Sequence, residues 1–395
     1  MNKYMYFSEF WLENTGIFER DGKRYIILMI VPLVINISAI IGGIAELSRV
    51  TDDFQLVAEL VSAWLLSINA ITRFNCLIIN RKKMIRLRHV VKTGKVSGGQ
   101  LSEADDQILS HYDRLGLRFC RIYSLIALVV SVSMLLQPIP GMLIFGHQRK
   151  LPFPIYYPFN TNTTIGYLAA YVHEIMSGCA VIIQILSFDS WFIFLLHHTS
   201  SNLHLLQNWL EKITETEQHR VHEKIVRCIR LHQNAYKFAA DLEEVFNRTV
   251  ILLFLVTTVN ICISGYALTR SGSQPQLLVK HFSAISGQIL QALLLNWCGQ
   301  LIEDKASICA TNIMKESFIL KTSVGVSLAV SRAKLYELKL NHQKDLGLLM
   351  MIRSQTPISL TAGKFYNLSL VTFTNVRFRS MYSAYQIDVP NLHRA

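Results

Sequence analysis

The chain has 395 residues, of which 51% are hydrophobic and 17% are charged; this balance excludes a solvated disordered chain and favours a membrane protein. Its formal net charge of +12 is compatible with nucleic-acid binding or with the charge asymmetry of a membrane protein. The sequence has no zinc-finger spacing, basic zipper or aromatic-interleaved basic strand, so we expect no nucleic-acid partner and assign the charge to membrane topology.

Seven stretches are long and apolar enough to cross a bilayer as helices, which takes about 20 residues each. In chain order they are residues 25–44, 54–79, 122–145, 165–196, 250–268, 281–302 and the more polar 364–387. The first is too long for the core of a signal peptide, and no small-residue cleavage site follows it at once. We predict an all-α membrane protein with seven transmembrane helices that forms a single unit over residues 1–395.

Basic residues are distributed unequally between the two sides of these spans. If the chain crosses at every span, 29 of the 39 Lys and Arg residues lie on the side of the amino terminus and 6 on the other side, with four in or at the edges of spans. Because cytoplasmic loops carry the excess of Lys and Arg, we predict a cytoplasmic amino terminus and an outside carboxyl terminus.

One N-glycosylation sequon fits this orientation. Asn162 lies in the predicted outer loop between the third and fourth spans, whereas the sequons at Asn36, Asn247 and Asn367 fall in or beside spans and are expected to be unused. None of the seven cysteines lies in an outer loop, which weakens the hypothesis of a G-protein-coupled receptor, because such receptors usually tether an outer loop by a disulfide.

The fourth span continues beyond the membrane. Residues 197–246 contain no proline or glycine, and their apolar residues recur three and four apart. We predict long amphipathic helices that pack on the cytoplasmic side as an assembly platform. Six histidines along them are expected on solvated polar faces: His197, His198, His204, His219, His222 and His232.

Motifs of known enzyme classes are missing from the sequence. It has no phosphate-binding loop, dinucleotide-binding motif or nucleophile elbow. His173-Glu174 and His222-Glu223 each begin like a metalloprotease motif, but neither has the second histidine four positions on. We therefore expect no enzyme activity, no cofactor and no metal site.

The seventh span is unusually polar for a helix in a membrane. Thr372, Asn375, Arg379, Ser383 and Gln386 step by three and four residues and fall on one face. Polar atoms facing lipid are costly, so this face should meet protein or water. The pattern alone fits an internal helix of a monomeric bundle and a pore-lining helix equally well.

Several runs resemble signatures of insect odorant receptors. They are Arg353-Ser354-Gln355-Thr356-Pro357, residues 360–370, Thr372-Phe373-Thr374 and Tyr382-Ser383-Ala384-Tyr385 near the carboxyl terminus, and Leu151-Pro152-Phe153-Pro154 with Tyr157-Pro158-Phe159 in the outer loop. The carboxyl-terminal match is the specific one, and the size, the spans and the long fourth helix agree with it over the whole chain.

The resemblance implies a subunit of a tetrameric, ligand-gated, non-selective cation channel in the plasma membrane of olfactory sensory neurons, in which an odorant-binding subunit assembles with a shared co-receptor. Residues 25–302 would form a six-helix ligand-binding bundle, 303–363 a cytoplasmic anchor and 364–387 the pore-lining helix. The implied pore and gate residues are Thr372, Asn375, Ser383, Ala384, Tyr385, Gln386 and Ile387.

The resemblance also places an odorant pocket in the outer half of the bundle. A small volatile, mostly apolar ligand needs apolar and aromatic walls with a few polar groups. The candidates are Trp64, Ser67, Ser131, Met134, Tyr171, Met176, Phe282 and Ser286, and ordinary helix packing explains any single one of them equally well. His173 and Glu174 are expected to face the outer loop, and Asp189 to pair within the bundle.

Two departures from the family pattern bear on the channel. Residues 317–331 are an unusual stretch, for which an insertion at 314–334 and a gene-model error are the two explanations, and Leu335-Tyr336 stands where the family usually has Trp-Tyr. Arg377 and Arg379 make the last span more basic than usual, which bears on ion selectivity. The alternatives are a G-protein-coupled receptor and a homomeric gustatory-type receptor channel that works without a co-receptor.

Overall fold

The computed structural model describes residues 4–18, 23–50, 54–94, 101–139, 151–212, 218–270, 275–325, 360–362, 366–370 and 374. Its helices are α1 (Tyr6–Glu13), α2 (Lys23–Leu47), α3 (Phe54–Ile79), α4 (Arg81–Thr93), α5 (Glu103–Leu136), α7 (Thr164–Glu211), α8 (Gln218–Arg270) and α9 (Pro275–Gly325). Two short strands, β1 (Thr361–Ala362) and β2 (Tyr366–Asn367), form an antiparallel hairpin. Within these residues, six helices are long and apolar enough to cross a membrane.

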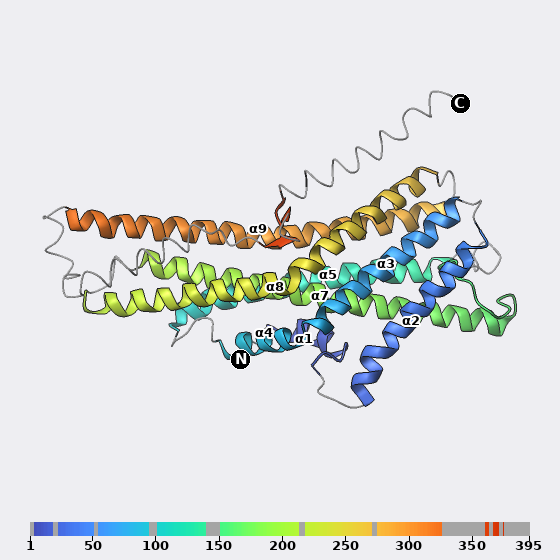
Figure 1. Cartoon of the computed structure of the whole chain (residues 1–395), viewed down its shortest axis with the longest axis horizontal. Coiled ribbons are helices and arrows are strands. Elements are labelled where there is room, and N and C mark those ends of the chain that lie inside the picture. Colours follow the sequence, from blue (N-terminus) through green and yellow to red (C-terminus); the bar gives the residue numbers. More distant parts are fainter. Residues whose placement is uncertain are drawn as a thin grey trace, which may run out of the picture.

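The three longest helices extend beyond the membrane-spanning bundle. α7, α8 and α9 have 48, 53 and 51 residues. At 1.5 Å per residue each is roughly 70 to 80 Å long, more than twice the thickness of a bilayer core. Figure 1 shows them side by side toward the left, past the ends of α2 and α3. The prediction of long helical extensions to the fourth and fifth spans is confirmed.

Five of the predicted spans each lie within a single helix, and the third needs a correction. α5 begins at Glu103, where Ser102 and Asp105 form a capping box, and ends at Leu136 rather than at Phe145. The apolar run continues past Leu136 in the sequence, but Pro138 has no N–H with which to continue the helical hydrogen-bond ladder.

The start of the predicted seventh span is also corrected. Thr361 pairs with Asn367 and Ala362 with Tyr366, so residues 366 and 367, within the predicted span, form a strand and not part of a helix. The hairpin is held to α8 by hydrogen bonds from Asn247 Nδ2 to Thr361 Oγ1 and from Thr361 Oγ1 to Glu243 Oε1, both 2.7 Å long. Most of residues 364–387, including the predicted polar stripe, lies outside the described residues.

α7 forms the centre of the molecule. Residues 186–203 are buried without interruption, because α1, α2, α3, α5, α8 and α9 all pack against this helix. The prediction that the histidines of the extensions are solvated is wrong for His197, His198 and His232, which are buried. Neighbouring helices cover them, and His198 Nδ1 lies 3.2 Å from Asp113 Oδ1 on α5.

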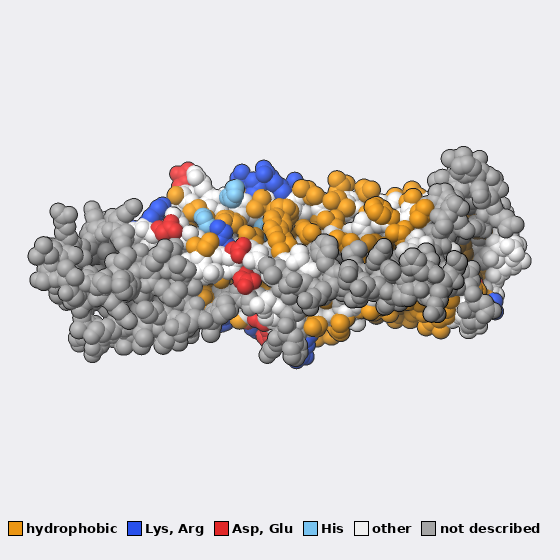
Figure 2. Space-filling model, turned by 90° about the horizontal axis from the view of Figure 1, so that it is seen from above, with side chains coloured by type: hydrophobic (Ala, Val, Ile, Leu, Met, Phe, Trp, Pro, Cys, Tyr) orange, Lys and Arg blue, Asp and Glu red, His pale blue; other side chains and the backbone are white. Residues whose placement is uncertain are grey.

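Large apolar side chains are exposed on the outer faces of the bundle. They include Ile27, Val34 and Ile41 on α2, Leu125, Val129 and Val132 on α5, and Leu252, Leu255 and Val259 on α8. Figure 2 shows apolar side chains gathered over the right-hand part of the molecule, and Lys, Arg, Asp and Glu side chains farther left. Exposed apolar surface on this scale is what lipid covers in a membrane protein.

Candidate functional site

A cavity of about 160 Å³ lies inside the bundle, among α2, α3, α5, α7, α9 and residues 153 and 155 of the segment that precedes α7. Its walls are mainly apolar and include Leu60, Leu66, Ile126, Val130, Val181 and Ile185. For comparison, an apolar protein cavity of about 150 Å³ holds a benzene molecule. The cavity therefore suits one small, mostly apolar molecule of about that size.

Four of the eight predicted ligand-binding residues line this cavity. They are Trp64 and Ser67 on α3 and Ser131 and Met134 on α5. Ser67 follows Trp64 by three residues, as Met134 follows Ser131, so each pair shares one helix face. The structure thus brings these four side chains together, and their contact with a ligand stays a prediction.

The other four predicted residues lie outside the cavity lining. Met176 and Phe282 have exposed fractions of 46% and 66% and point away from the core. The Tyr171 hydroxyl donates a hydrogen bond to the Leu135 carbonyl at 2.8 Å, and Ser286 is exposed. Both α7 and α9 are apolar on more than one face, so their composition alone did not identify the side that meets the cavity.

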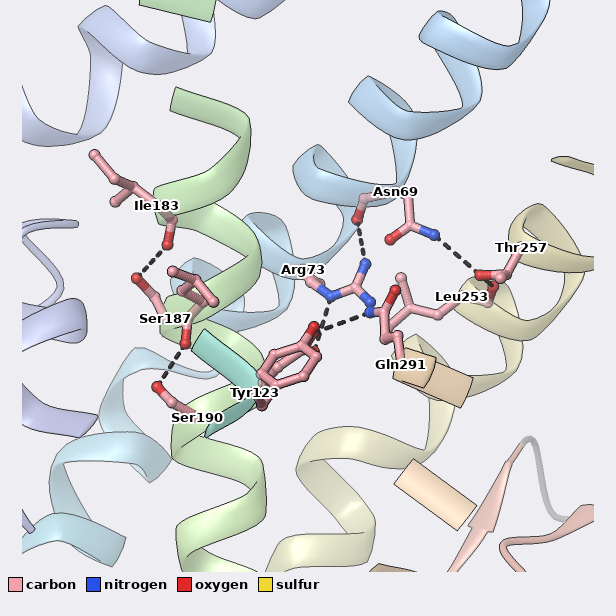
Figure 3. A network of polar contacts seen from close by, with 11 residues as sticks. Asn69, Arg73, Tyr123, Ile183, Ser187, Ser190, Leu253, Thr257 and Gln291 are labelled. Carbon is pink, nitrogen blue, oxygen red and sulfur yellow. Dashed lines mark hydrogen bonds and ion pairs between the residues drawn. The ribbon is translucent and has the colours of Figure 1, made fainter. Parts of the chain in front are cut away.

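A buried polar network joins α3, α5, α7, α8 and α9 and includes two residues of the cavity wall; Figure 3 shows the network from close by. Asp189 on α7 accepts hydrogen bonds from Arg73 Nε at 3.0 Å, from Gln291 Nε2 at 3.0 Å and from the Tyr123 hydroxyl. Arg73 also donates to the Asn69 carbonyl, and Asn69 Nδ2 donates to Thr257 on α8. The prediction that Asp189 pairs within the bundle is confirmed.

Tyr123 and Gln291 belong to both the network and the cavity, because both line its wall. Arg73 and Asp189 are 0% and 1% exposed, so water does not solvate their charges. The two charges are instead compensated by each other and by these hydrogen bonds. A molecule in the cavity therefore lies against side chains that also hold the central ion pair. This coupling was missed in the sequence, although a charge inside an apolar span is a recognised signal of a functional position.

The segment before α7 covers part of the cavity. Phe153 and Ile155 line the cavity, and the Phe153 N–H donates to Glu174 Oε2 at 2.9 Å. Lys280 Nζ on α9 donates to the Pro152 carbonyl at 2.9 Å and pairs with Glu59 Oε2 on α3 at 3.0 Å. This segment is therefore held directly to α7 and α9, to α2 by the Tyr156 N–H that donates to the Gly42 carbonyl, and to α3 through Lys280.

The expectation that His173 and Glu174 face the outer loop is confirmed for His173, whereas Glu174 meets the segment before α7 through one oxygen and also lines the cavity. The Tyr157 hydroxyl lies 3.0 Å from His173 Nδ1 and also donates to the Ala170 carbonyl. Burial, followed by the nearby Glu174 carboxylate, raises the pKa of Tyr157 above its usual value, so its hydroxyl remains available as a donor.

The described residues include no group of three or more His, Cys, Asp or Glu side chains that could hold a metal ion. The predicted pore and gate positions, Thr372, Asn375, Ser383, Ala384, Tyr385, Gln386 and Ile387, lie outside the described residues. Asn162 is exposed in the segment before α7, and its N–H donates to Asn160 Oδ1 at 2.9 Å.

Six apolar spans, long helical extensions and an internal apolar cavity define a multi-pass membrane protein with a site for a small molecule. Residues 54–315 match the family model described as 7tm Odorant receptor. The match covers more than half of the chain, which therefore belongs to the odorant receptor family, a family of ligand-gated cation channels. Nothing in these matches supports a G-protein-coupled receptor.

Individual relatives and solved structures agree with this assignment. Odorant receptor 49a of Drosophila melanogaster is 24% identical over 311 residues, which cover 76% of this chain and 73% of that receptor. Odorant receptor 47a of the same species is 19% identical over 257 residues, which cover 64% and 66%. The structure of olfactory receptor OR5 from Machilis hrabei in complex with eugenol superposes with a TM-score of 0.74, at 12% identity and over 97% of this chain and 99% of that one.

Proposed function

We propose that this chain is the odorant-tuning subunit of a non-selective cation channel, assembled as a tetramer with a co-receptor subunit in the plasma membrane of olfactory sensory neurons. The observation that carries the proposal is the apolar cavity inside the bundle. A volatile ligand binds mainly through apolar surface, with a few polar groups that fix its orientation, and the cavity has this composition.

Ligand binding would bias the channel through the polar network. Tyr123 and Gln291 touch the cavity and also hold Asp189, whose network reaches α3, α5, α7, α8 and α9. A ligand shifts an equilibrium only by contacts that differ between the two states. We therefore assign the coupling step to a change in how these two side chains share their hydrogen bonds between Asp189 and the ligand.

The pore is assigned to the last span, on the strength of its polar stripe and of the resemblance to the family. In this assignment the polar side chains of Thr372, Asn375, Ser383 and Gln386 face the ion path, and Ala384, Tyr385 and Ile387 form the gate near its outer end. The excess of basic residues supports a cytoplasmic amino terminus.

The test is expression in a cell that lacks odorant receptors, with and without the co-receptor, during exposure to a panel of volatile molecules. We expect a rapid cation current only when both subunits are present, and the current should persist when G proteins are blocked. A current abolished by the blockade would refute the channel mechanism. A current from this chain alone would identify a homomeric, gustatory-type channel and refute the co-receptor requirement.

A further inference from the structure

Gln288 places a buried amide in the wall of the cavity. The side chain lies on α9, is 5% exposed and lines the cavity. Neither its Nε2 nor its Oε1 has a hydrogen-bond partner within the described part of the chain. Buried polar groups in proteins are nearly always paired, and the cost of leaving them unpaired rises in the low dielectric of a membrane protein interior. We therefore expect the Gln288 amide to form a hydrogen bond with a polar group of a molecule in the cavity.

Several of the other polar side chains of the wall already have partners. Tyr123 and Gln291 donate to Asp189, and the Ser177 hydroxyl donates to Asn36 Oδ1 at 3.0 Å. Glu174 accepts from the Phe153 N–H through one oxygen and leaves the other unpaired, and the Trp64 indole N–H is also unpaired. Among the described lining residues, Gln288 is the one amide whose donor and acceptor are both unpaired, and the hydroxyls of Ser67 and Ser131 are smaller polar groups of the same wall.

The side-chain amide of Gln288 can form hydrogen bonds with an oxygen-containing group of a ligand. A ligand hydroxyl accepts from Nε2 and donates to Oε1, and a ligand carbonyl accepts from Nε2. The cavity of about 160 Å³ limits the rest of the molecule to roughly one six-membered ring with a short substituent.

We propose that Gln288 is a specificity-determining residue that selects ligands carrying one hydroxyl or carbonyl on a small apolar body over hydrocarbons of the same shape. The inference rests on the proposed function in one respect, that the cavity is the ligand site.

The experiment compares pairs of probes that differ in this one group. Benzyl alcohol is matched with ethylbenzene, and acetophenone with cumene. Dissociation constants are measured by saturation-transfer NMR titration on the purified full-length chain in lipid nanodiscs, for the wild type and for Gln288→Met, which keeps the length of the side chain and removes the amide. Within each pair, the dissociation constant of the hydrocarbon is divided by the dissociation constant of the oxygenated probe, and this ratio is compared between the proteins.

We expect Gln288→Met to lower that ratio roughly tenfold, because one buried hydrogen bond is lost for the oxygenated probe and none for the hydrocarbon. The cost of removing the ligand hydroxyl or carbonyl from water is the same in both proteins and cancels. Gln300→Leu is the matched control, since Gln300 lies on the same helix, outside the cavity lining, with its amide bonded to Asp304 at 2.7 Å. It should leave the ratio unchanged.

The outcomes separate this inference from the channel proposal. An unchanged ratio in Gln288→Met, or no binding of any probe to the wild type, would overturn the role of Gln288. A shifted ratio in a protein that carries no current with its co-receptor would support the role of Gln288 and refute the channel proposal. If Gln288→Met does not yield a monodisperse protein, Gln288→Leu is measured in its place, with the same expectation.

Discussion

At the scale of single residues, Asp189 accepts hydrogen bonds from side chains on three other helices. Arg73, Tyr123 and Gln291 all donate to its carboxylate, and Asp189 is 1% exposed. Removal of one partner of a buried pair is more harmful than removal of both, because it leaves an uncompensated charge. The two residues would be left with unequal contacts if the ion pair were lost. Asp189 would keep two hydrogen-bond donors, whereas Arg73 would keep only the Asn69 carbonyl and the Phe188 ring.

This inequality predicts an order of stabilities. Asp189→Leu should destabilise the folded chain by about 3–5 kcal/mol and Arg73→Met by less, and the double variant should recover part of the loss. The measurement is thermal unfolding of the purified chain in detergent, with Lys237→Met on the exposed face of α8 as control. Additive losses in the double variant would show that the two charges do not compensate each other.

Ser131 and Ser133 on α5 provide a matched pair for the cavity. Ser131 lines the cavity, whereas Ser133 is exposed on the outer surface with its hydroxyl bonded to the Val130 carbonyl. A phenylalanine at 131 would fill much of the space that a ligand needs. We therefore expect Ser131→Phe to abolish the odorant-evoked current while the surface level of the receptor is retained. Ser133→Phe should leave the current within about twofold, and equal effects of the two variants would argue against this cavity as the ligand site.

At the scale of elements, Lys280 is one of the residues that hold the segment before α7 over the cavity. Loss of this lysine removes the bonds to the Pro152 carbonyl and to Glu59, while the bonds from the Phe153 N–H to Glu174 and from the Tyr156 N–H to the Gly42 carbonyl remain. We expect Lys280→Met to shorten the decay of the current after ligand washout severalfold, because the cover over the ligand opens more often. The double variant Glu59→Gln/Lys280→Met removes the charge left on Glu59 and should show the same acceleration. An unchanged decay in both variants would mean that ligands leave by another route.

Gly299 allows α9 to lie close to the hairpin, because glycine has no side chain. A Cβ on Gly299 would overlap the carbonyl oxygen and the side chain of Leu368, the residue that follows β2. Gly299→Ala should therefore displace the hairpin from α9 and lower the surface expression of the receptor. Gly265→Ala is the control, because a Cβ on Gly265 meets no atom within 4 Å. Normal expression of Gly299→Ala would show that α9 yields at this point.

The sequence predicted the helices well and the cavity in part, for physical reasons that differ between elements. Length and hydropathy identify a span without knowledge of its neighbours, so α3 matches residues 54–79. The boundary of α5 and the hairpin at residues 361–367 depend on local backbone geometry that hydropathy does not record. Glu174 and Gln288 face the cavity because of how α7 and α9 are rotated in the bundle, which one sequence does not specify.

At the scale of the whole molecule, apolar and charged surfaces separate along the long axis. The exposed apolar side chains cover the six-span bundle, and charged side chains gather where the long helices leave it (Figure 2). Ion pairs such as Arg88 with Glu9 and Lys83 with Glu244 join α4 to α1 and α8 on the charged side. The position of Lys83 and Arg88 on this charged part agrees with the excess of basic residues on the side of the amino terminus, which supports a cytoplasmic amino terminus.

Glycosylation tests this orientation directly. Asn162 is exposed in the segment that covers the cavity, on the side opposite the predicted amino terminus, so it should carry a glycan when the chain is made in a eukaryotic cell. Endoglycosidase treatment should then increase the mobility of the wild type on a gel, and Asn162→Gln should run like the treated protein. The buried Asn36 is an internal control, because Asn36→Gln should leave the glycan unchanged. A glycan on a sequon placed in an added amino-terminal extension, together with none on Asn162, would invert the topology and put the ligand cavity on the cytoplasmic side.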